Sequence, residues 1–400
     1  MNSKFKILKL ENVATIFAGG DKPQLFSETK NDEFKVPVYA NGETNKGLQG
    51  YTNKAKVIDP AVTVSARGTI GYAVLRREPF VPIVRLLTLI PNKDLLDIGF
   101  LYYYLTLYRQ KGIGSSQKQL IAPDLSERTI SLPLLSTQKS IAKVLSYLDA
   151  KIELNNRINA ELEAMAKIIY DYWFVQFDFP DKNGKPYKSS GGKMVWNEKI
   201  KREIPEGWEV AKIGKALKVS LGGTPSTENI EFWDNGTIPW LNSGEIAEFP
   251  IVNSELKITP KAILNSATEL LPKGTVLLSI TRHLRPSILA IDACANQSVV
   301  GIKEKAAINS NYIYPLIKNE IPRYMTLRTG AQQPHINKET VEDTDFVIPD
   351  NKTLEHYNRI VTPIYNQINL RAFENLKVIE IRDFLLPMLM NGQISVGDTK

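Results

Sequence analysis

The segment TQKSIAKVLSYLDAKIELNNRINAELEAMAKIIYDYWF, which begins at Thr137, determines how the chain is organised. Its apolar residues recur at steps of mostly three and four: Ile141, Val144, Leu145, Leu148, Ile152, Ile158, Leu162, Met165, Ile169 and Tyr172. This spacing predicts one amphipathic helix over residues 137–177, with Thr137 as its N-cap. No proline follows before Pro180, so roughly 40 residues at about 1.5 Å each span on the order of 60 Å. The seam slips by one residue around Asn155-Asn156, where we expect a local change of supercoil.

A second helix of the same pattern begins at Thr353, at an offset of 216 residues from Thr137. Its sequence is TLEHYNRIVTPIYNQINLRAFENLKVIEIRDFLLPMLM. Eight apolar positions agree between the helices: Tyr357, Val361, Ile364, Ile368, Val378, Ile381, Leu385 and Met388 align with Ile141, Leu145, Leu148, Ile152, Leu162, Met165, Ile169 and Tyr172. Ile158 aligns with Glu374 and interrupts the series. Each apolar stripe needs a partner, and the simplest one is the other helix, packed antiparallel in a coiled coil.

The repeat also includes the segments that precede the helices. Gly19-Gly20, within LKLENVATIFAGGDKP, aligns with Gly222-Gly223, within AKIGKALKVSLGGTP. Further matches are Val36-Pro37 with Ile238-Pro239, Thr63–Gly71 with Val276–Leu284, and GSSQKQL (114–120) with GAQQPHI (330–336). Internal duplication fixes the architecture, so the chain is a tandem of two units.

Each unit combines short apolar runs bounded by Gly and Pro with a helical segment such as Ile98–Gln110. We therefore predict α/β (α+β) globular domains in tandem, separated by two long antiparallel helices in a pseudo-two-fold arrangement. The connector is rich in Gly, Pro, Ser and Lys, and we expect a small hairpin closed at Asn183-Gly184. The expected parts are a first domain 1–136, a central helix 137–177, a connector 178–204, a second domain 205–352, a C-terminal helix 353–391 and a tail 392–400.

Composition favours a soluble globular protein in a reducing cytoplasm. The 400 residues are 43% hydrophobic, and neither a signal peptide nor a run of about 18 apolar residues is present. A single cysteine excludes an intrachain disulfide and a cysteine-based zinc site, and three histidines leave little for metal binding. The formal charge of +7 permits a polyanionic partner.

The sequence lacks the common catalytic motifs. No GxxxxGK[ST], GxGxxG after a strand, HExxH or GxSxG is present, nor the Asn-Pro-Pro-aromatic tetrapeptide of amino-methylating DNA methyltransferases. Asp350 could belong to a nuclease site, but an acidic residue at the head of a helix is ordinary first-turn chemistry. His335, between Pro334 and Ile336, has no evident acid-base partner, so a polar loop contact is the better interpretation. We therefore predict no catalytic residue and no metal site in this chain.

Several loops carry residues suited to reading DNA bases. Arginine can bind guanine bidentately, and Asn and Gln can bind adenine in the same way, whereas lysines hold phosphates. The candidates in the first unit are Arg67, Arg76, Arg77, Lys111, Gln117, Lys118 and Gln119, and those in the second are Arg282, His283, Arg285, Arg328, Gln332, Gln333 and His335. Asn296-Gln297 in the second unit belongs to the same set of loop residues that could read base edges. Each residue alone could be an ordinary solvated loop residue, but Gly-x-x-Gln recurs at the same place in both units.

The two domains differ in charge. Residues 1–136 contain 18 Lys and Arg against 12 Asp and Glu, a net charge of +6. Residues 204–350 contain 14 against 17, a net charge of −3. The second domain is therefore not a general polyanion binder, and it needs a local patch or a partner that supplies phosphate contacts.

The whole chain resembles the specificity subunits of type I restriction-modification systems. The most specific segments are STQKSIAKVLSYLDAKIELNNRIN, the run from Tyr170 to Trp208, the segment RDFLLPMLMNGQISV, and IPWLNSGEI in the second domain. The resemblance implies two target recognition domains, each reading one half of a bipartite DNA site, with a helical rod that sets the spacer. It also implies a subunit without catalysis of its own.

The resemblance further implies partners and cofactors. The partners would be double-stranded DNA, two modification (methyltransferase) subunits and restriction/translocase subunits. Association with a membrane is not expected. S-adenosylmethionine, ATP and Mg²⁺ would belong to the partner subunits and none to this chain. Tyr170, Trp173 and Phe174, left over from the helix seam, are candidates for holding a modification subunit, with core packing against the connector as the alternative. A coiled-coil adaptor that reads no DNA, and the recognition portion of a fused restriction enzyme, are the competing hypotheses.

Overall fold

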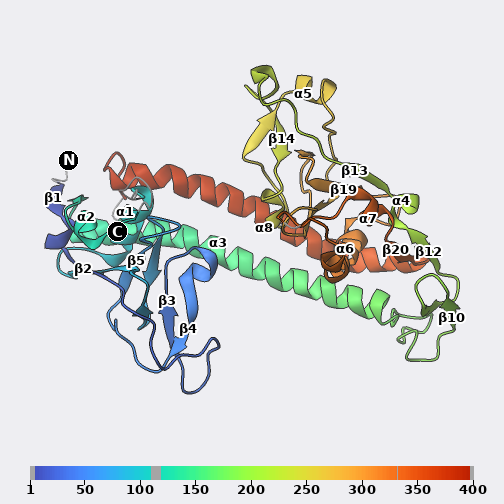
Figure 1. Ribbon diagram of the computed structural model, residues 1–400, viewed down its shortest axis with the longest axis horizontal. Coiled ribbons are helices and arrows are strands. Elements are labelled where there is room, and N and C mark those ends of the chain that lie inside the picture. The colour runs from blue at the N-terminus through green and yellow to red at the C-terminus, as the bar shows by residue number, and fades with distance from the viewer. Residues whose placement is uncertain (1–4, 110–118, 331, 397–400) are drawn as a thin grey trace. The chain divides into compact units, whose positions relative to one another are not determined.

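The computed structural model describes residues 5–109, 119–330 and 332–396 (Figure 1). The chain forms two compact units. Unit 1 contains the residues up to Ile152 and those from Lys377 onward, and unit 2 contains Glu153–Leu376. Each unit holds a mixed α/β domain together with part of each long helix, so the helices belong to both units and do not form a body of their own. The predicted fold class, tandem α/β domains with two long helices, is confirmed.

Unit 1 contains two small sheets, a strand pair and short helices. Its strands are β1 (Lys6–Lys9), β2 (Ala14–Ala18), β3 (Val36–Tyr39), β4 (Leu48–Thr52), β5 (Ala61–Val64), β6 (Ala73–Arg76), β7 (Val81–Pro82), β8 (Leu87–Pro91) and β9 (Thr129–Leu132). Its short helices are η1 (Leu10–Asn12), η2 (Thr44–Gly47), α1 (Ile98–Leu107) and α2 (Ala122–Ser126). The strand orders are β2-β8-β5-β6, β4-β3-β7 and β1-β9. Apolar residues of the four-stranded sheet and α1 pack with Ile141 and Leu145 of the first long helix.

Unit 2 repeats this arrangement and adds the connector hairpin. Its strands are β10 (Met194–Asn197), β11 (Arg202–Pro205), β12 (Glu209–Lys212), β13 (Lys218–Leu221), β14 (Ile238–Leu241), β15 (Leu256–Ile258), β16 (Val276–Ser279), β17 (Arg285–Ile288), β18 (Cys294–Ala295), β19 (Val299–Lys303) and β20 (Asp345–Ile348). Its short helices are α4 (Ile213–Ala216), η4 (Ile230–Phe232), η5 (Glu245–Ala247), α5 (Pro260–Leu264), α6 (Ser310–Thr326) and α7 (Lys338–Glu342). The strand orders are β13-β19-β16-β17, β15-β14-β18, β12-β20 and β10-β11.

The two domains therefore share one topology. The order β2-β8-β5-β6 corresponds to β13-β19-β16-β17, and β4-β3-β7 corresponds to β15-β14-β18. In both three-stranded sheets the central strand pairs antiparallel with one neighbour and parallel with the other. Within each unit, this smaller sheet projects away from the long-helix segments (Figure 1). The sequence repeat is a structural repeat.

The repeated Gly-Gly pair is required by close backbone packing. A Cβ on Gly19 would lie 2.7 Å from the carbonyl carbon of Pro82, and one on Gly222 would lie 2.2 Å from the carbonyl oxygen of Asn296. The Gly19 N–H donates to the Leu86 carbonyl at 2.8 Å, and Gly222 does the same to Val299 at 2.9 Å. Only glycine fits at such an approach, so the pair fixes the turn between β7 and β8 and the equivalent turn between β18 and β19.

The long helices begin slightly earlier than predicted. The first, α3, covers Leu135–Tyr170 and continues as a π-helical turn, η3, over Asp171–Val175. The second, α8, covers Asn351–Met390. Thr137 is therefore not an N-cap, because it lies inside the first turn. Asp350 caps α8 by accepting from the Thr353 N–H at 3.1 Å and from its hydroxyl at 2.6 Å, which confirms ordinary first-turn chemistry there.

The helices pack antiparallel, and polar residues continue the seam where its apolar series stops. Asn155 and Asn159 of α3 are buried in unit 2, at steps of three and four from Ile152. Asn155 bonds to Asn375 of α8 at 2.8 Å, while Asn159 bonds to the earlier Ile368 carbonyl at 3.2 Å, as antiparallel helices require. The predicted slip at Asn155-Asn156 reflects this change from apolar to polar seam residues.

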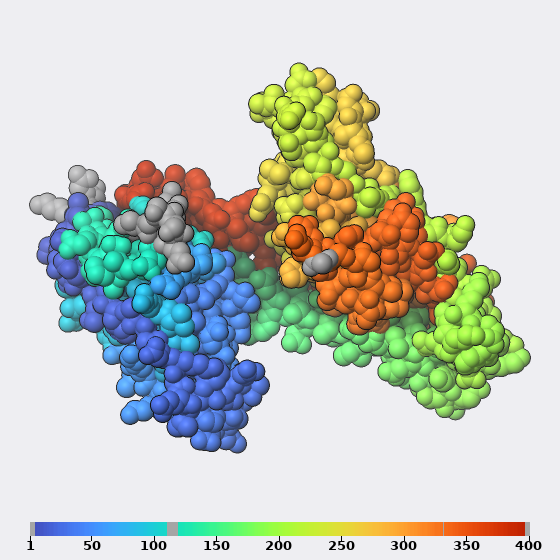
Figure 2. All heavy atoms as spheres, viewed as in Figure 1, coloured from blue at the N-terminus to red at the C-terminus, as the bar shows by residue number. Residues whose placement is uncertain are grey.

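The connector forms a small hairpin later than expected. The Asn183-Gly184 region makes a tight turn, in which the Gly184 N–H donates to the Asp181 carbonyl at 3.0 Å. The regular hairpin is β10-β11, paired from Met194 with Pro205 to Asn197 with Arg202. Figure 2 shows this part of unit 2 as a yellow-green protrusion on the surface.

Candidate nucleic-acid interface

In unit 1 the structure brings together two of the loops singled out from the sequence. The loop after β5 contains Arg67, and Gln119 precedes α2. The Leu120 N–H donates to the Ala66 carbonyl at 2.9 Å. Beside this link, Arg67 donates to the Gln119 Oε1 atom from Nη2 at 3.0 Å and from Nε at 3.3 Å. Arg67 is exposed, so a guanidinium with a fixed orientation faces solvent.

Unit 2 brings the equivalent loops together with the same backbone link. The Ile336 N–H donates to the Ile280 carbonyl at 3.0 Å, and the Arg282 N–H donates to the Pro334 carbonyl at 2.9 Å. Arg328, which is half-buried, donates from Nη1 to the Arg282 carbonyl at 3.4 Å. The exposed candidates in these two loops are Arg282, His283, Gln332, Gln333 and His335, and Arg285, at the start of β17, is exposed as well. Two loops from distant parts of the sequence thus form one polar surface.

The ring of His335 takes part in this loop contact. Its Nδ1 atom lies 3.0 Å from the Gln333 carbonyl oxygen, and its main chain forms a two-hydrogen-bond pair with Thr329 at 2.9 Å. This agrees with the expectation of a polar loop contact. In the described part of the chain, no three His, Cys, Asp or Glu side chains lie together as a potential metal site.

Comparison with known proteins agrees with this arrangement. The family model described as the type I restriction modification DNA specificity domain matches residues 2–164 and again residues 205–380. The chain belongs to this family. It is thus a DNA specificity subunit of a type I restriction-modification system, and it functions with the other subunits of that system, which carry the catalysis.

Individual relatives cover most of the chain. The type I restriction enzyme MjaIX specificity subunit of Methanocaldococcus jannaschii is 26% identical over 398 residues, 95% of this chain and 88% of the relative. The EcoR124I/EcoR124II specificity subunit of Escherichia coli is 28% identical over 306 residues, 72% of this chain and 68% of the relative. The crystal structure of the S subunit from M. genitalium shares the fold, with a TM-score of 0.60, 16% identity, and coverage of 97% of this chain and 96% of that one.

Arg76 of this specificity subunit is not available to DNA, so its assignment as a DNA-binding residue is wrong. Its side chain is 5% exposed. The guanidinium lies 3.6 Å from the centre of the Tyr39 ring and donates to the Thr63 hydroxyl at 3.1 Å and to the Lys46 carbonyl at 2.6 Å. Burial lowers the pKa of this guanidinium. Arg76 therefore supports the loop of Lys46 from inside the domain, whereas Arg77 is exposed.

Three other candidates of the first unit, Lys111, Gln117 and Lys118, lie outside the described residues. Within the described part of the specificity subunit, no helix has both the length and the apolar character needed to cross a membrane.

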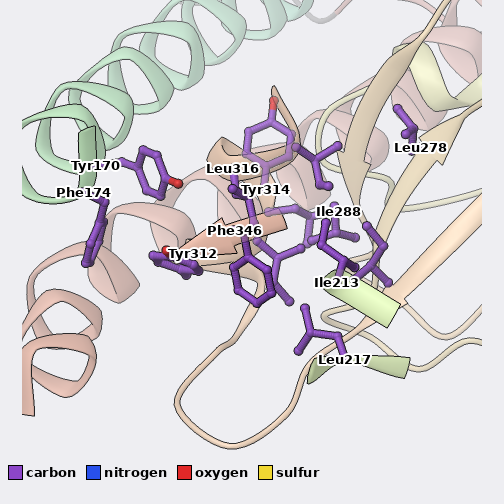
Figure 3. Packing of buried hydrophobic residues seen from close by; sticks show 14 of the residues in the cluster. Tyr170, Phe174, Ile213, Leu217, Leu278, Ile288, Tyr312, Tyr314, Leu316 and Phe346 are labelled. Atoms are coloured by element: carbon purple, nitrogen blue, oxygen red, sulfur yellow. The ribbon is translucent and has the colours of Figure 1, made fainter. Parts of the chain in front are cut away.

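The aromatic residues predicted to hold a modification subunit are part of the core of unit 2. Tyr170, Trp173 and Phe174 are between 3% and 5% exposed. Figure 3 shows Tyr170 and Phe174 directed toward Tyr312 of α6, with ring centres 5.5 Å and 4.8 Å from it. The Trp173 ring lies 5.7 Å from that of Tyr357 in α8. Their assignment as partner contacts is wrong, and core packing, the alternative, is what the structure shows.

A different set of apolar residues on the long helices is exposed. Met165 and Ile381 were assigned to the seam, but they are exposed, and in α3 the neighbouring Ala166 is buried instead. The exposed residues of α3 recur in α8 at the repeat offset. Each helix thus has its own exposed apolar stripe, whose members are between 42% and 68% exposed: Leu154, Met165 and Ile168 on α3, and Leu370, Ile381 and Phe384 on α8. An alignment of the two helices could have identified these residues from the sequence, as apolar positions that match between the helices but do not follow the seam spacing.

Proposed function

We propose that each unit of this specificity subunit reads one half of a bipartite DNA target through its paired loops. The observation that carries the proposal is the repeated link between the loops, Leu120 to Ala66 in unit 1 and Ile336 to Ile280 in unit 2. Each link places an arginine next to a glutamine-containing loop, and these side chains can distinguish guanine and adenine in the major groove. Because the loop residues of the two units differ, the two halves of the DNA target would differ in sequence.

The charges of the two domains support a shared role in phosphate binding. Residues 1–136 have a net charge of +6, but residues 204–350 have a net charge of −3. Affinity for DNA depends on neutralised phosphates, so we propose that subunits bound beside unit 2 supply part of these contacts. Two readers on a repeated scaffold would address half-sites about one helical turn apart, roughly 34 Å between centres.

The proposed partners are two modification subunits and, through them, restriction/translocase subunits. The exposed apolar stripe supports this stoichiometry, since equivalent residues on α3 and α8 offer two similar surfaces to two copies of one partner. S-adenosylmethionine, ATP and Mg²⁺ would be bound by those subunits, and for ATP this agrees with the lack of a GxxxxGK[ST] motif in the present sequence. We place the complex in the cytoplasm, where the host DNA lies.

Exchange of one domain tests the proposal. Residues 1–136 would be replaced by the corresponding segment of another specificity subunit, and the methylated adenines of the host genome would be mapped by sequencing. We expect one half of the methylated site to change and the other half to stay the same. A change in both halves, or in neither, would contradict separate reading by the two units.

The second candidate function, an adaptor that binds no DNA, is disfavoured by the family assignment. Co-purification distinguishes the two. The specificity role predicts an adenine methyltransferase bound in a two-to-one ratio, whereas an adaptor would be isolated without DNA preference.

A further inference from the structure

The turn between β7 and β8 has an unusual backbone. Val84 and Arg85 both adopt left-handed conformations, with φ of 53° and 59°, and both side chains are exposed. A β-branched residue such as valine rarely adopts positive φ. Such strain persists where the surrounding structure fixes it, and it is concentrated at functional sites.

Three hydrogen bonds to two other segments of the chain hold this turn. The Val84 N–H donates to the Gly20 carbonyl at 2.8 Å, and the Arg85 N–H donates to the Gly19 carbonyl at 3.1 Å. The Asn41 Nδ2 group donates to the Val84 carbonyl at 2.7 Å. The turn is therefore rigid, and it presents the Arg85 guanidinium to solvent.

Asn41 also connects this turn to the arginine loop. Its Oδ1 atom accepts the Ala66 N–H at 2.7 Å, and Ala66 immediately precedes Arg67. The adjacent Gly42 N–H donates to the Ser65 hydroxyl at 3.2 Å. One amide side chain thus bridges Val84 and Ala66, which places the turn beside the loop already assigned to DNA.

Unit 2 makes the same connection without a side chain. Ile280 corresponds to Ala66, because the two carbonyls accept the equivalent N–H groups of Ile336 and Leu120. The Ile280 N–H donates directly to the carbonyl of Ser298, in the turn between β18 and β19, at 2.9 Å. This turn presents Gln297, which is exposed. Both repeats therefore join the same turn to the same loop, although they use different chemistry to do so.

We propose that this turn is a further DNA-reading element in each unit, with Arg85 and Gln297 contacting base edges and Asn41 acting as a positioning residue for Arg85 and Arg67. The inference rests on the proposed function, since it adds contacts to the same surface. An arginine and a glutamine are the side chains that read guanine and adenine. Within the described residues, the Arg85 side chain has no hydrogen bond or ion pair that would occupy its donors.

The base preference of single variants tests the two contacts. The complex is purified from its host through a tag on the full-length chain and is used to select from a library of random-sequence duplex DNA. We expect Arg85→Ala to relax the preference at one or two positions of the half-site read by unit 1, by about 5- to 150-fold. Gln297→Ala should relax positions in the other half only. Arg128→Ala, which removes an exposed arginine before β9 in unit 1, is the matched control and should keep the wild-type preference.

Two outcomes are distinguishable. If the wild-type complex enriches a bipartite sequence and both Arg85→Ala and Gln297→Ala enrich the same one equally well, this inference is overturned alone. If the wild-type complex enriches no sequence, the proposed function fails and this inference fails with it.

The positioning role of Asn41 is tested by measuring how far the effects of substituting Arg67 and Arg85 on DNA binding depend on each other. Asn41→Asp keeps the acceptor for the Ala66 N–H but cannot donate to the Val84 carbonyl, and Asn41→Ala removes both bonds. We expect the effects of Arg67→Ala and Arg85→Ala on binding of the selected DNA to be non-additive in the wild-type background and additive with either Asn41 variant. A purely structural Asn41 would lower the unfolding temperature and leave this coupling unchanged, a result that would overturn its role as a positioning residue.

Discussion

Arg67 and Gln119 lie 52 residues apart in the sequence, yet two hydrogen bonds of 3.0 Å and 3.3 Å join the guanidinium to the amide oxygen. The glutamine thus orients the arginine before DNA arrives. Pre-organisation of this kind lowers the entropy lost on binding. Among the described residues the Arg67 side chain donates only to Gln119, so its other N–H donors can bind a base.

Substitution at these two positions should have graded effects. We expect Arg67→Ala to weaken binding of the selected site by about 1–3 kcal/mol, because a bidentate contact to guanine is lost. Gln119→Ala should weaken it by about 0.5–1.5 kcal/mol, the typical cost of ordering one side chain on binding. Arg67→Lys should not restore specificity, since lysine lacks the planar fork. Titration of labelled wild-type and half-site-substituted duplexes measures these effects, and equal losses on both half-site variants would refute local reading.

The sequence predicted what local periodicity and internal repetition determine. The two helices and the tandem α/β domains follow from patterns that recur along the chain, whereas the contact between the arginine and glutamine loops came from the structure. Strand β5 recurs as β16, and the Gly-Gly pair recurs as well, because the same close backbone packing is required in both domains.

Long-range packing decided what the sequence did not predict. Arg76 and Arg77 look alike in sequence, but Arg76 is the last residue of β6 and is buried against Tyr39, whereas Arg77 lies just beyond the strand and is exposed. Tyr170 and Phe174 are buried by Tyr312, which is far away in the chain. The bridge made by Asn41 has no sequence signal, because in unit 2 a backbone group takes its place.

The exposed apolar stripe of each helix predicts how the proposed modification subunits attach. We expect Ile168→Glu and Phe384→Glu each to remove one of two partner subunits, since burying either apolar side chain in an interface contributes about 1.5–3 kcal/mol and an introduced carboxylate would be desolvated. Native mass spectrometry of the co-purified complex should show a change from two modification subunits to one. Glu161→Gln, at an exposed position of α3, is the control. Retention of two partners in both variants would exclude the stripe as their docking surface.

Glu269 should give unit 2 a pH-dependent contribution to stability. Lys218 of β13 and Lys303 of β19 are directly opposite each other, an unfavourable pairing of like charges. Glu269 accepts from Lys303 at 2.6 Å and from Lys218 at 3.1 Å. The Lys303 hydrogen bond, followed by those from Ser220 and Lys218, lowers the pKa of Glu269 to about 2 from its ordinary value of 4.5.

The sign of the pH effect follows from this depressed pKa. The folded state keeps Glu269 ionised where the unfolded state protonates it, so its contribution is complete above pH 4.5 and is lost as the pH falls toward about 2. Glu269→Gln removes the titrating group. We expect the stability difference between wild type and Glu269→Gln, measured by denaturant unfolding, to shrink across this window. A difference that stays constant from neutral pH down to pH 2 would contradict the ion pairs.

The buried asparagines between α3 and α8 should affect both the stability of unit 2 and the register in which the two helices pack. Asn375 is buried, accepts from Asn155 at 2.8 Å and donates to Asn156 at 2.7 Å. Asn375→Leu leaves the buried Asn155 amide without this partner and removes the bond to the exposed Asn156, so we expect it to destabilise unit 2 by about 1–3 kcal/mol in denaturant unfolding. Asn155→Leu/Asn375→Leu removes both members of one bond and should cost less than the sum of the two single substitutions.

The double variant should also lose precision in the register, because buried asparagines specify helix alignment and an all-apolar seam permits alternatives. If the long helices set the spacer between half-sites, as the family resemblance implies, DNA selected by the Asn155→Leu/Asn375→Leu complex should contain more than one spacer length, with both half-site sequences unchanged. A single wild-type spacer in that variant would show that apolar packing alone fixes the register. A loss of half-site preference would instead show that the substitutions disturb the domains themselves. Denaturant unfolding of the same variant, compared with that of the wild type, would then show a destabilised domain.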